Sequence, residues 1–217
     1  MPDVLDLSKE GLDAASIARQ ALADDKVFEE LIYGISPDRK KITIRENSFR
    51  ALMLLCEKHP DRLLPHWEYL VGLLQSNNSY SKYAAIHIIA AIVPADKHGL
   101  FDKAFDIYYD LLDDRSIMVA AHAAGRSGKI ARAKPALQPK ITGRLLNIEQ
   151  THFDQGRQDL IKPFIIESFE EYFERSQDKA QILAFVRQQV NCRSPKARKL
   201  AKAFLYKWEG AEGTEGT

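Results

Sequence analysis

The chain has 217 residues, of which 45% are hydrophobic and 28% are charged, and its formal net charge is +1. This composition is typical of a folded globular protein and excludes a disordered polar chain, while a net charge near zero argues neither for nor against nucleic acid. The sequence has no apolar stretch of about 18 residues, and no basic segment followed by an apolar run near its start, so we expect no membrane contact, no export and a cytoplasmic location.

The two cysteines, Cys56 and Cys192, lie far apart in the sequence and outside any C-x-x-C pattern. Isolated cysteines of this kind are typical of reduced thiols in or near the core of a cytosolic protein. We therefore expect no disulfide.

The first predicted elements are a pair of helices at residues 12–36. Residues 1–11 before them are acidic and contain few apolar side chains, which predicts a loose lead-in. Asp13 can cap the first helix, whose apolar side chains recur at the helical spacing i, i+3, i+4, i+7. We interpret the pair as an N-terminal cap whose acidic residues face water.

Four further helix pairs are predicted, followed by one last helix that starts at Ser194-Pro195. The pairs cover about 41–76, 79–114, 116–149 and 153–191, and the last helix covers 194–208. In the first three of these four pairs, the second helix ends in a Leu-Leu dipeptide followed by a polar turn. The dipeptides are Leu73-Leu74, Leu111-Leu112 and Leu145-Leu146.

The spacings between these dipeptides are 38 and 34 residues. A period of this size is typical of a helical solenoid, in which each helix pair buries its apolar face against the next pair. The sequence therefore predicts an all-α protein with a single repeat domain at 1–209. Residues 210–217 are rich in Gly, Glu and Thr, which predicts a disordered tail.

The unit at 116–149 contains glycines inside its first predicted helix. This helix starts at Ser116, and Gly125, Ser127 and Gly128 follow. Because glycine is a weak helix former and is common at helix ends, we expect the helix to end about there. The second helix of the unit begins at Pro135, where a missing N–H costs nothing.

Parts of the chain resemble the HEAT-repeat family. Residues Ile44–Leu52 are similar to the start of the family's A helix, residues 60–74 are similar to its B helix, and residues 120–130 and 135–146 repeat that arrangement. The resemblance covers roughly residues 41–150. It implies a right-handed solenoid of stacked antiparallel helix pairs, with B helices lining a concave face that binds protein partners, and a non-enzymatic role as scaffold or adaptor.

The unit at 115–148 carries seven Lys or Arg residues and no Asp or Glu. Six of these cations are the candidate partner-binding residues: Arg126, Lys129, Arg132, Lys134, Lys140 and Arg144. We expect the first four to crowd the turn between the two helices. The last two are four residues apart and should share one face of the second helix.

Three explanations fit this basic unit. Its cations contact an acidic protein partner, or they bind nucleic-acid phosphates with an affinity that falls as salt rises, or they are solvated and balanced by neighbouring acidic units. The unit contains no aromatic residue able to stack on bases, which favours the protein partner over nucleic acid. The sequence indicates no particular oligomeric state.

The sequence suggests no catalytic residue, no cofactor and no metal site. The six histidines are dispersed without H-x-x-x-H or H-E-x-x-H spacing, and His87 is predicted to be a buried core residue. Asp113-Asp114 is predicted to be a turn. The carboxylates at Glu167, Glu170, Glu171 and Glu174 are predicted to be the solvated face of an amphipathic helix.

One enzymatic alternative follows from the repeat class. Bacterial DNA glycosylases that remove alkylated bases are also HEAT-like solenoids, and they use an Asp, a Trp and an Arg on the concave face. Here neither Trp67 nor Trp208 neighbours an aspartate in a comparable motif, and both are predicted to be core residues. We therefore expect no enzyme.

Overall fold

The computed structural model describes residues 6–210. Within these residues it contains eleven α-helices, several short 3-10 helices and no β-strand, which confirms the predicted all-α class. The chain forms two compact units that divide between Ile107 and Tyr108. The single repeat domain at 1–209 stays a prediction, and the predicted tail lies outside the described residues apart from Gly210.

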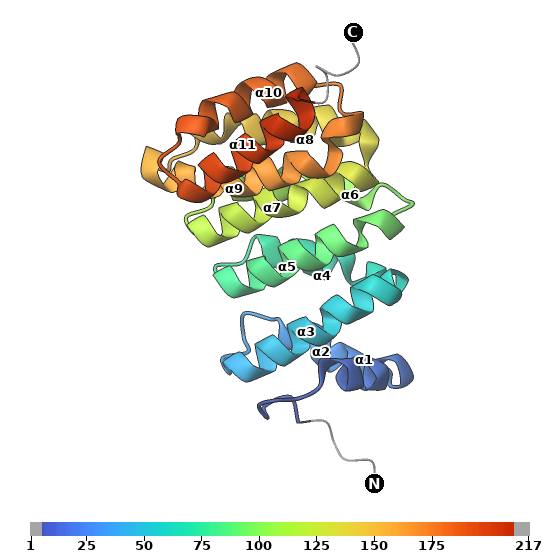
Figure 1. The fold of residues 1–217 in the computed structure, drawn as a ribbon. Helices are drawn as coiled ribbons and strands as arrows, with labels where there is room; N and C mark the ends of the chain where they lie inside the picture. The colour runs from blue at the N-terminus through green and yellow to red at the C-terminus, as the bar shows by residue number, and fades with distance from the viewer. Residues whose placement is uncertain (1–5, 211–217) are drawn as a thin grey trace. The chain divides into compact units, whose positions relative to one another are not determined.

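The helices of the first unit are coloured blue to green in Figure 1. They are α1 (Ala14–Ala23), α2 (Asp25–Gly34), α3 (Ile42–Lys58), the 3-10 helices η1 (Pro60–Arg62) and η2 (Leu64–His66), α4 (Trp67–Leu74), α5 (Ser79–Ile92), η3 (Val93–Ala95) and most of α6 (Leu100–Tyr109). Helix α3 packs against α1, α2 and α5, and α4 packs against α5. The predicted helix cap at Asp13 is confirmed, since the Asp13 carboxylate accepts hydrogen bonds from the backbone N–H groups of Ala15 and Ser16.

The segment before α1 is not loose where it is described. Leu7 is buried, and the side-chain amide of the buried Asn47 donates hydrogen bonds to the carbonyl oxygens of Leu7 (3.0 Å) and Lys9 (2.9 Å). A buried amide needs such partners, and this segment supplies them. The prediction of a loose lead-in was therefore wrong for residues 6–11, while residues 1–5 lie outside the described part.

Helix α5 is buried almost all round. Its residues from Ala84 to Ile92 are all buried, including His87. The His87 ring contacts the rings of Tyr83 and Phe49, with centroids 4.4 Å and 5.7 Å away. The prediction of a buried core histidine is therefore confirmed.

The second unit contains the end of α6 and all the remaining helices, coloured yellow-green to red in Figure 1. They are η4 (Asp110–Asp113), α7 (Ile117–Ala133), η5 (Pro135–Leu137), α8 (Gln138–Leu146), η6 (Asn147–Gln150), α9 (Gln155–Tyr172), η7 (Phe173–Arg175), α10 (Lys179–Gln188), η8 (Gln189–Asn191) and α11 (Pro195–Glu209). Helix α9 packs against both α7 and α11, while α8 packs against α7 and α10. The predicted start of the last helix is confirmed, because Ser194 Oγ accepts a hydrogen bond from the backbone N–H of Ala197.

Helix α7 continues through Gly125 and Gly128 to Ala133, so its predicted end near these glycines was wrong. Gly128 is needed for a close helix contact. A Cβ atom added at Gly128 would lie 2.7 Å from the carbonyl oxygen of Ser168 on α9, closer than real Cβ contacts come. The Ser168 hydroxyl also joins the helices, because it donates to Ala124 O (2.5 Å) and accepts from Gly128 N (3.1 Å). The α9 contact thus outweighs the weak helix propensity of glycine.

The contact predicts opposite effects for two glycine substitutions. Gly128→Ala should lower the free energy of unfolding by about 1–3 kcal/mol, because the added methyl group must push α7 and α9 apart. Gly143→Ala on α8 is the matched control, since a Cβ there meets no atom within 4 Å. It should raise stability by about 0.5–1 kcal/mol through helix propensity. Urea unfolding followed by circular dichroism measures both, and a Gly128→Ala variant as stable as the control would contradict this account of the contact.

Candidate functional site

Arg126, Lys129 and Arg132 lie within α7 and not in a turn, because α7 runs further than the sequence suggested. Arg126 is exposed and Lys129 is half-buried. With His122 they follow the spacing i, i+4, i+7, so the three side chains share one outward stripe of the helix. Within residues 6–210, neither Arg126 nor Lys129 has a carboxylate partner.

His122 contributes no charge to this stripe at neutral pH. Burial and the positive charge of Arg126 both hold the pKa of its imidazole below the usual value. Its ring instead contacts the ring of Phe164 on α9, with centroids 6.0 Å apart. The positive charge on the outward side of α7 therefore comes from Arg126 and Lys129.

The other candidate cations lie elsewhere. Arg132 is close to the end of α7 and its Nε is 3.6 Å from a Glu171 oxygen, while Lys134 is the half-buried residue that follows α7. Lys140 and Arg144 do lie on one side of α8, as expected. Arg144 makes an ion pair with Asp110 in η4 at 3.3 Å.

The six candidate residues do not form one patch. Helix α8 turns Ile141 and Leu145 into the core, and Lys140 and Arg144 occupy its opposite side. Helix α7 likewise turns its small residues inward and its cations outward. Because α7 and α8 pack on each other through their buried sides, their outward sides face away from one another. The candidate cations on α7 therefore form one group, and those on α8 form another.

An open cleft of about 570 Å³ lies beside Arg132. The cleft is lined by the ends of α7, α9 and α11 and by the start of α8, with these polar or aromatic side chains among others: Arg132, Gln138, Glu170, Glu171, Glu174, Arg175, Lys207 and Trp208. The Glu170 carboxylate accepts a hydrogen bond from Trp208 Nε1 (2.9 Å) and pairs with Lys207. Trp67 is buried with 4% of its surface exposed, as predicted, whereas Trp208 is only half-buried.

The carboxylates of α9 are not a purely solvated face, which corrects the prediction from the sequence. Glu167 pairs with Lys196 at 2.7 Å, Glu170 pairs with Lys207, and Glu171 pairs with Arg132. These ion pairs join α9 to α11 on one side and to α7 on the other. The α9 sequence alone does not show which cations lie beside it.

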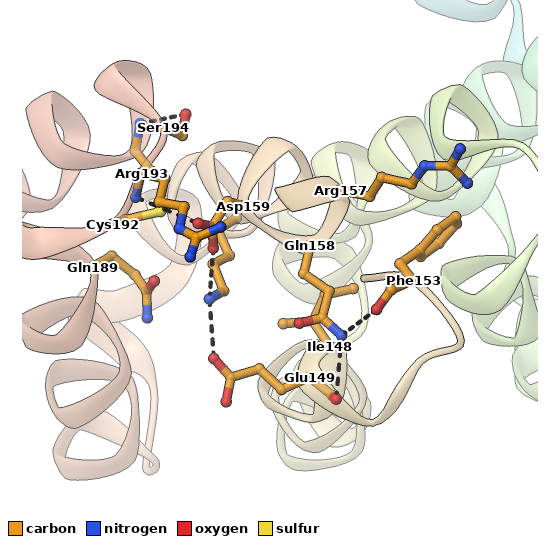
Figure 2. A network of polar contacts seen from close by, with 12 residues as sticks. Ile148, Glu149, Phe153, Arg157, Gln158, Asp159, Gln189, Cys192, Arg193 and Ser194 are labelled. Atoms are coloured by element: carbon orange, nitrogen blue, oxygen red, sulfur yellow. Dashed lines mark hydrogen bonds and ion pairs between the residues drawn. The ribbon is translucent and has the colours of Figure 1, made fainter. Parts of the chain in front are cut away.

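A buried polar network joins three segments of the second unit, and the sequence analysis did not find it. Lys162 and Asp159 on α9 are 4% and 3% exposed, and Lys162 Nζ lies 3.0 Å from both Asp159 Oδ1 and Glu149 Oε1. The backbone N–H of Arg193 donates to Asp159 Oδ2 at 3.4 Å. Figure 2 shows Cys192 and Arg193 on one side of Asp159 and Glu149 on the other. The sequence does contain a signal for this network. Asp159 and Lys162 have opposite charges, are three residues apart, and fall on the side of α9 that carries buried apolar residues.

The pKa shifts in this network indicate a structural role. Burial of Lys162 opposes its charged form, but hydrogen bonds and charges from Glu149 and Asp159 outweigh that effect and raise its pKa. Burial also raises the pKa of the Cys192 thiol. At neutral pH Lys162 is therefore a cation and Cys192 a neutral thiol, and neither is tuned to act as a nucleophile.

The described residues form neither a metal site nor a membrane-spanning helix. Among residues 6–210, no group of three or more His, Cys, Asp or Glu side chains lies close enough together to hold a metal ion. No helix in the same part of the chain is long and apolar enough to span a membrane.

No protein-family model matches the chain, and no curated protein or solved structure matches it significantly. The HEAT-like resemblance therefore stays a hypothesis.

Removal of the buried lysine should destabilise the second unit. Lys162→Met leaves the Asp159 carboxylate buried without its cation, so we expect the free energy of unfolding to fall by about 3–5 kcal/mol. Arg157→Met is the control, because Arg157 pairs with Asp154 at 3.8 Å on the exposed surface. An exposed pair is worth at most about 1 kcal/mol. Urea unfolding at neutral pH compares the two variants, and equal losses would contradict the assigned role of Lys162.

The stability that Lys162 contributes depends on pH, and the direction of that dependence follows from its pKa. The pKa of Lys162 in the folded chain lies above its ordinary value of 10.5. The contribution of Lys162 to stability is therefore fully present below pH 10.5 and is lost as the pH rises through the higher, folded pKa. The stability difference between wild type and Lys162→Met should accordingly be constant near neutral pH and shrink in strong alkali.

Proposed function

We propose that this chain is a HEAT-like helical-repeat protein that acts as a non-enzymatic scaffold or adaptor and binds an acidic protein partner through the basic unit at 115–148. The observation that carries the proposal is the outward stripe of α7, where Arg126 and Lys129 have no carboxylate partner among the described residues. Cations of this kind attract an acidic surface without first having to break an internal ion pair.

The proposed position of the contact differs between the two helices of the unit. By the family resemblance α7 is an A helix and α8 is a B helix, and B helices line the concave face. Arg144 on α8 already pairs with Asp110, so a partner on that side has to compete with this ion pair. We therefore place the main contact on α7 and treat the expected contact along the concave face, at Lys140 and Arg144, as the second position to test.

The packing inside each unit supports a solenoid. In the first unit α3 packs against α5, and in the second unit α9 packs against α7 and α11 while α8 packs against α10. When helix pairs stack, each helix contacts the helix two places further along the chain. We propose that the helices form a right-handed α-solenoid of stacked antiparallel pairs.

Nucleic acid is the alternative partner, because the same cations can neutralise phosphates. The alkylation-repair glycosylase is less favoured. Trp67 is buried and cannot contact a flipped base, and the half-buried Trp208 indole is held by its hydrogen bond to Glu170.

Charge reversal on α7 tests the binding proposal. Arg126→Glu combined with Lys129→Glu should remove a bound acidic protein in a pull-down from a lysate of the source cells. Lys140→Glu combined with Arg144→Glu tests the α8 side in the same way. Lys26→Glu combined with Lys58→Glu, at exposed positions of the first unit, controls for the same change in net charge. The proposal fails if both double variants retain the protein, and a signal that disappears on nuclease treatment would instead support the nucleic-acid alternative.

Small-angle X-ray scattering of the whole chain tests the solenoid. A continuous stack scatters as one elongated body, so the distance distribution should have a single maximum and a long tail. A distribution with two maxima, as produced by two bodies on a flexible connection, would contradict one continuous stack.

A further inference from the structure

A second hollow on the surface lies between α9 and α11. It is an apolar groove of about 270 Å³, and its residues are Ile166, Glu167, Glu170, Leu200, Ala203, Phe204 and Lys207. Ile166 and Phe204 are buried at its floor, Leu200 is half-buried, and Ala203 is exposed at its edge. Known small-molecule pockets have volumes of about 300–1,000 Å³, so this groove suits a single large side chain better than a whole ligand.

Ion pairs join the two walls of the groove. Lys196 pairs with Glu167 at 2.7 Å, and Lys207, about three turns further along α11, pairs with Glu170. Both pairs connect α11 to α9 from partly exposed positions, and they add to the packing of α11 on α9 that sets the distance between the helices. The groove is thus held open by contacts that form within the protein itself, and an occupant need not create it.

The α11 wall is strongly basic. Helix α11 carries five Lys or Arg residues and one carboxylate, that of Glu209. Lys199 and Lys202 are exposed and, in the part of the chain that the structure describes, have no carboxylate partner. Lys199 lies one helical turn before Ala203, at the edge of the groove. Tyr206, which is 86% exposed, lies one turn after Ala203.

We propose that the α9–α11 groove docks a segment of a partner protein in which one large apolar side chain is flanked by acidic residues. The apolar side chain fills the space over Ile166 and Phe204, and the flanking carboxylates face Lys199. A buried anchor side chain within a polar rim is the usual arrangement of strong contacts in protein interfaces. This site lies outside residues 115–148 and does not depend on the contact proposed for α7.

Two other occupants fit the charges less well. A second copy of the chain docked by twofold symmetry would bring one basic α11 against another, which is electrostatically unfavourable. An anionic lipid surface would meet the carboxylates of Glu167 and Glu170 at the groove itself. An acidic segment with a projecting apolar side chain avoids both conflicts, because only the side chain enters between the carboxylates.

The probe is a panel of fluorescein-labelled peptides in which one position is Leu, Phe, Trp, Met or Ala and all others are Glu. Fluorescence anisotropy with the full-length protein should detect binding of the peptides with a large apolar residue and about tenfold weaker binding of the Ala peptide. If no member of the panel binds, or if the Ala peptide binds as well as the others, the proposal is wrong.

Two variants locate the binding. Ala203→Trp fills the groove from an exposed position, and Lys199→Glu reverses the charge at its edge. Each should weaken binding of the Phe peptide about tenfold or more. The matched controls are Ala15→Trp and Lys26→Glu, at exposed positions of the first unit, and they should leave the affinity unchanged. Circular dichroism melting confirms that all four variants are folded, and equal affinities for Ala203→Trp and Ala15→Trp would overturn the assignment.

Further measurements separate this site from the others. The double variant Arg126→Glu, Lys129→Glu should still bind the Phe peptide, because the α7 stripe is not part of the groove. Sedimentation velocity detects a dimer, and a dimer that Ala203→Trp dissociates would assign the groove to a second copy. Sedimentation with phosphatidylserine vesicles detects lipid binding, and its loss in Ala203→Trp would assign the groove to a membrane surface. Either result would overturn the proposal.

Discussion

The close contact between α7 and α9 is the constraint on which the second unit depends. It requires a residue without a side chain at Gly128, and it uses the Ser168 hydroxyl to connect the backbones of the two helices. Once the helices lie this close, the positions of their outer side chains follow. Arg132 falls beside Glu171, His122 falls beside Phe164, and the cations of α7 that have no neighbour on α9 are left on the outside.

The same constraint explains why α9 is the central helix of its unit. It contacts α7 on one side and α11 on the other, so its surface residues become bridging residues. Its carboxylates pair with cations of both neighbours, and its buried Asp159 and Lys162 connect it to η6 and to the chain that precedes α11. Buried opposite charges contribute little net stability compared with apolar side chains, but removing one of them is costly. Such a pair therefore selects one arrangement of these segments over others.

Local patterns in the sequence predicted most of the helices. Spacings of apolar residues and the caps at Asp13 and Ser194 are read within one turn of the chain, so the all-α class and the start of the last helix were predictable. The continuation of α7 through Gly128 was not, because its cause is an atom forty residues away on Ser168. The separation of the six candidate cations into two groups could not be predicted, for a related reason. Composition identified the basic unit, but the split between α7 and α8 depends on which side of each helix is buried.

The two tryptophans of the chain lie in different units and in different surroundings. Trp67 is enclosed in the first unit, whereas the Trp208 indole in the second unit borders the open cleft and donates a hydrogen bond to a carboxylate. Indole emission depends on contact with water and with charged groups, so the two rings should differ in wavelength and in quenching. Each unit thus carries its own optical reporter, and loss of structure in one unit can be distinguished from loss in the other without any added label.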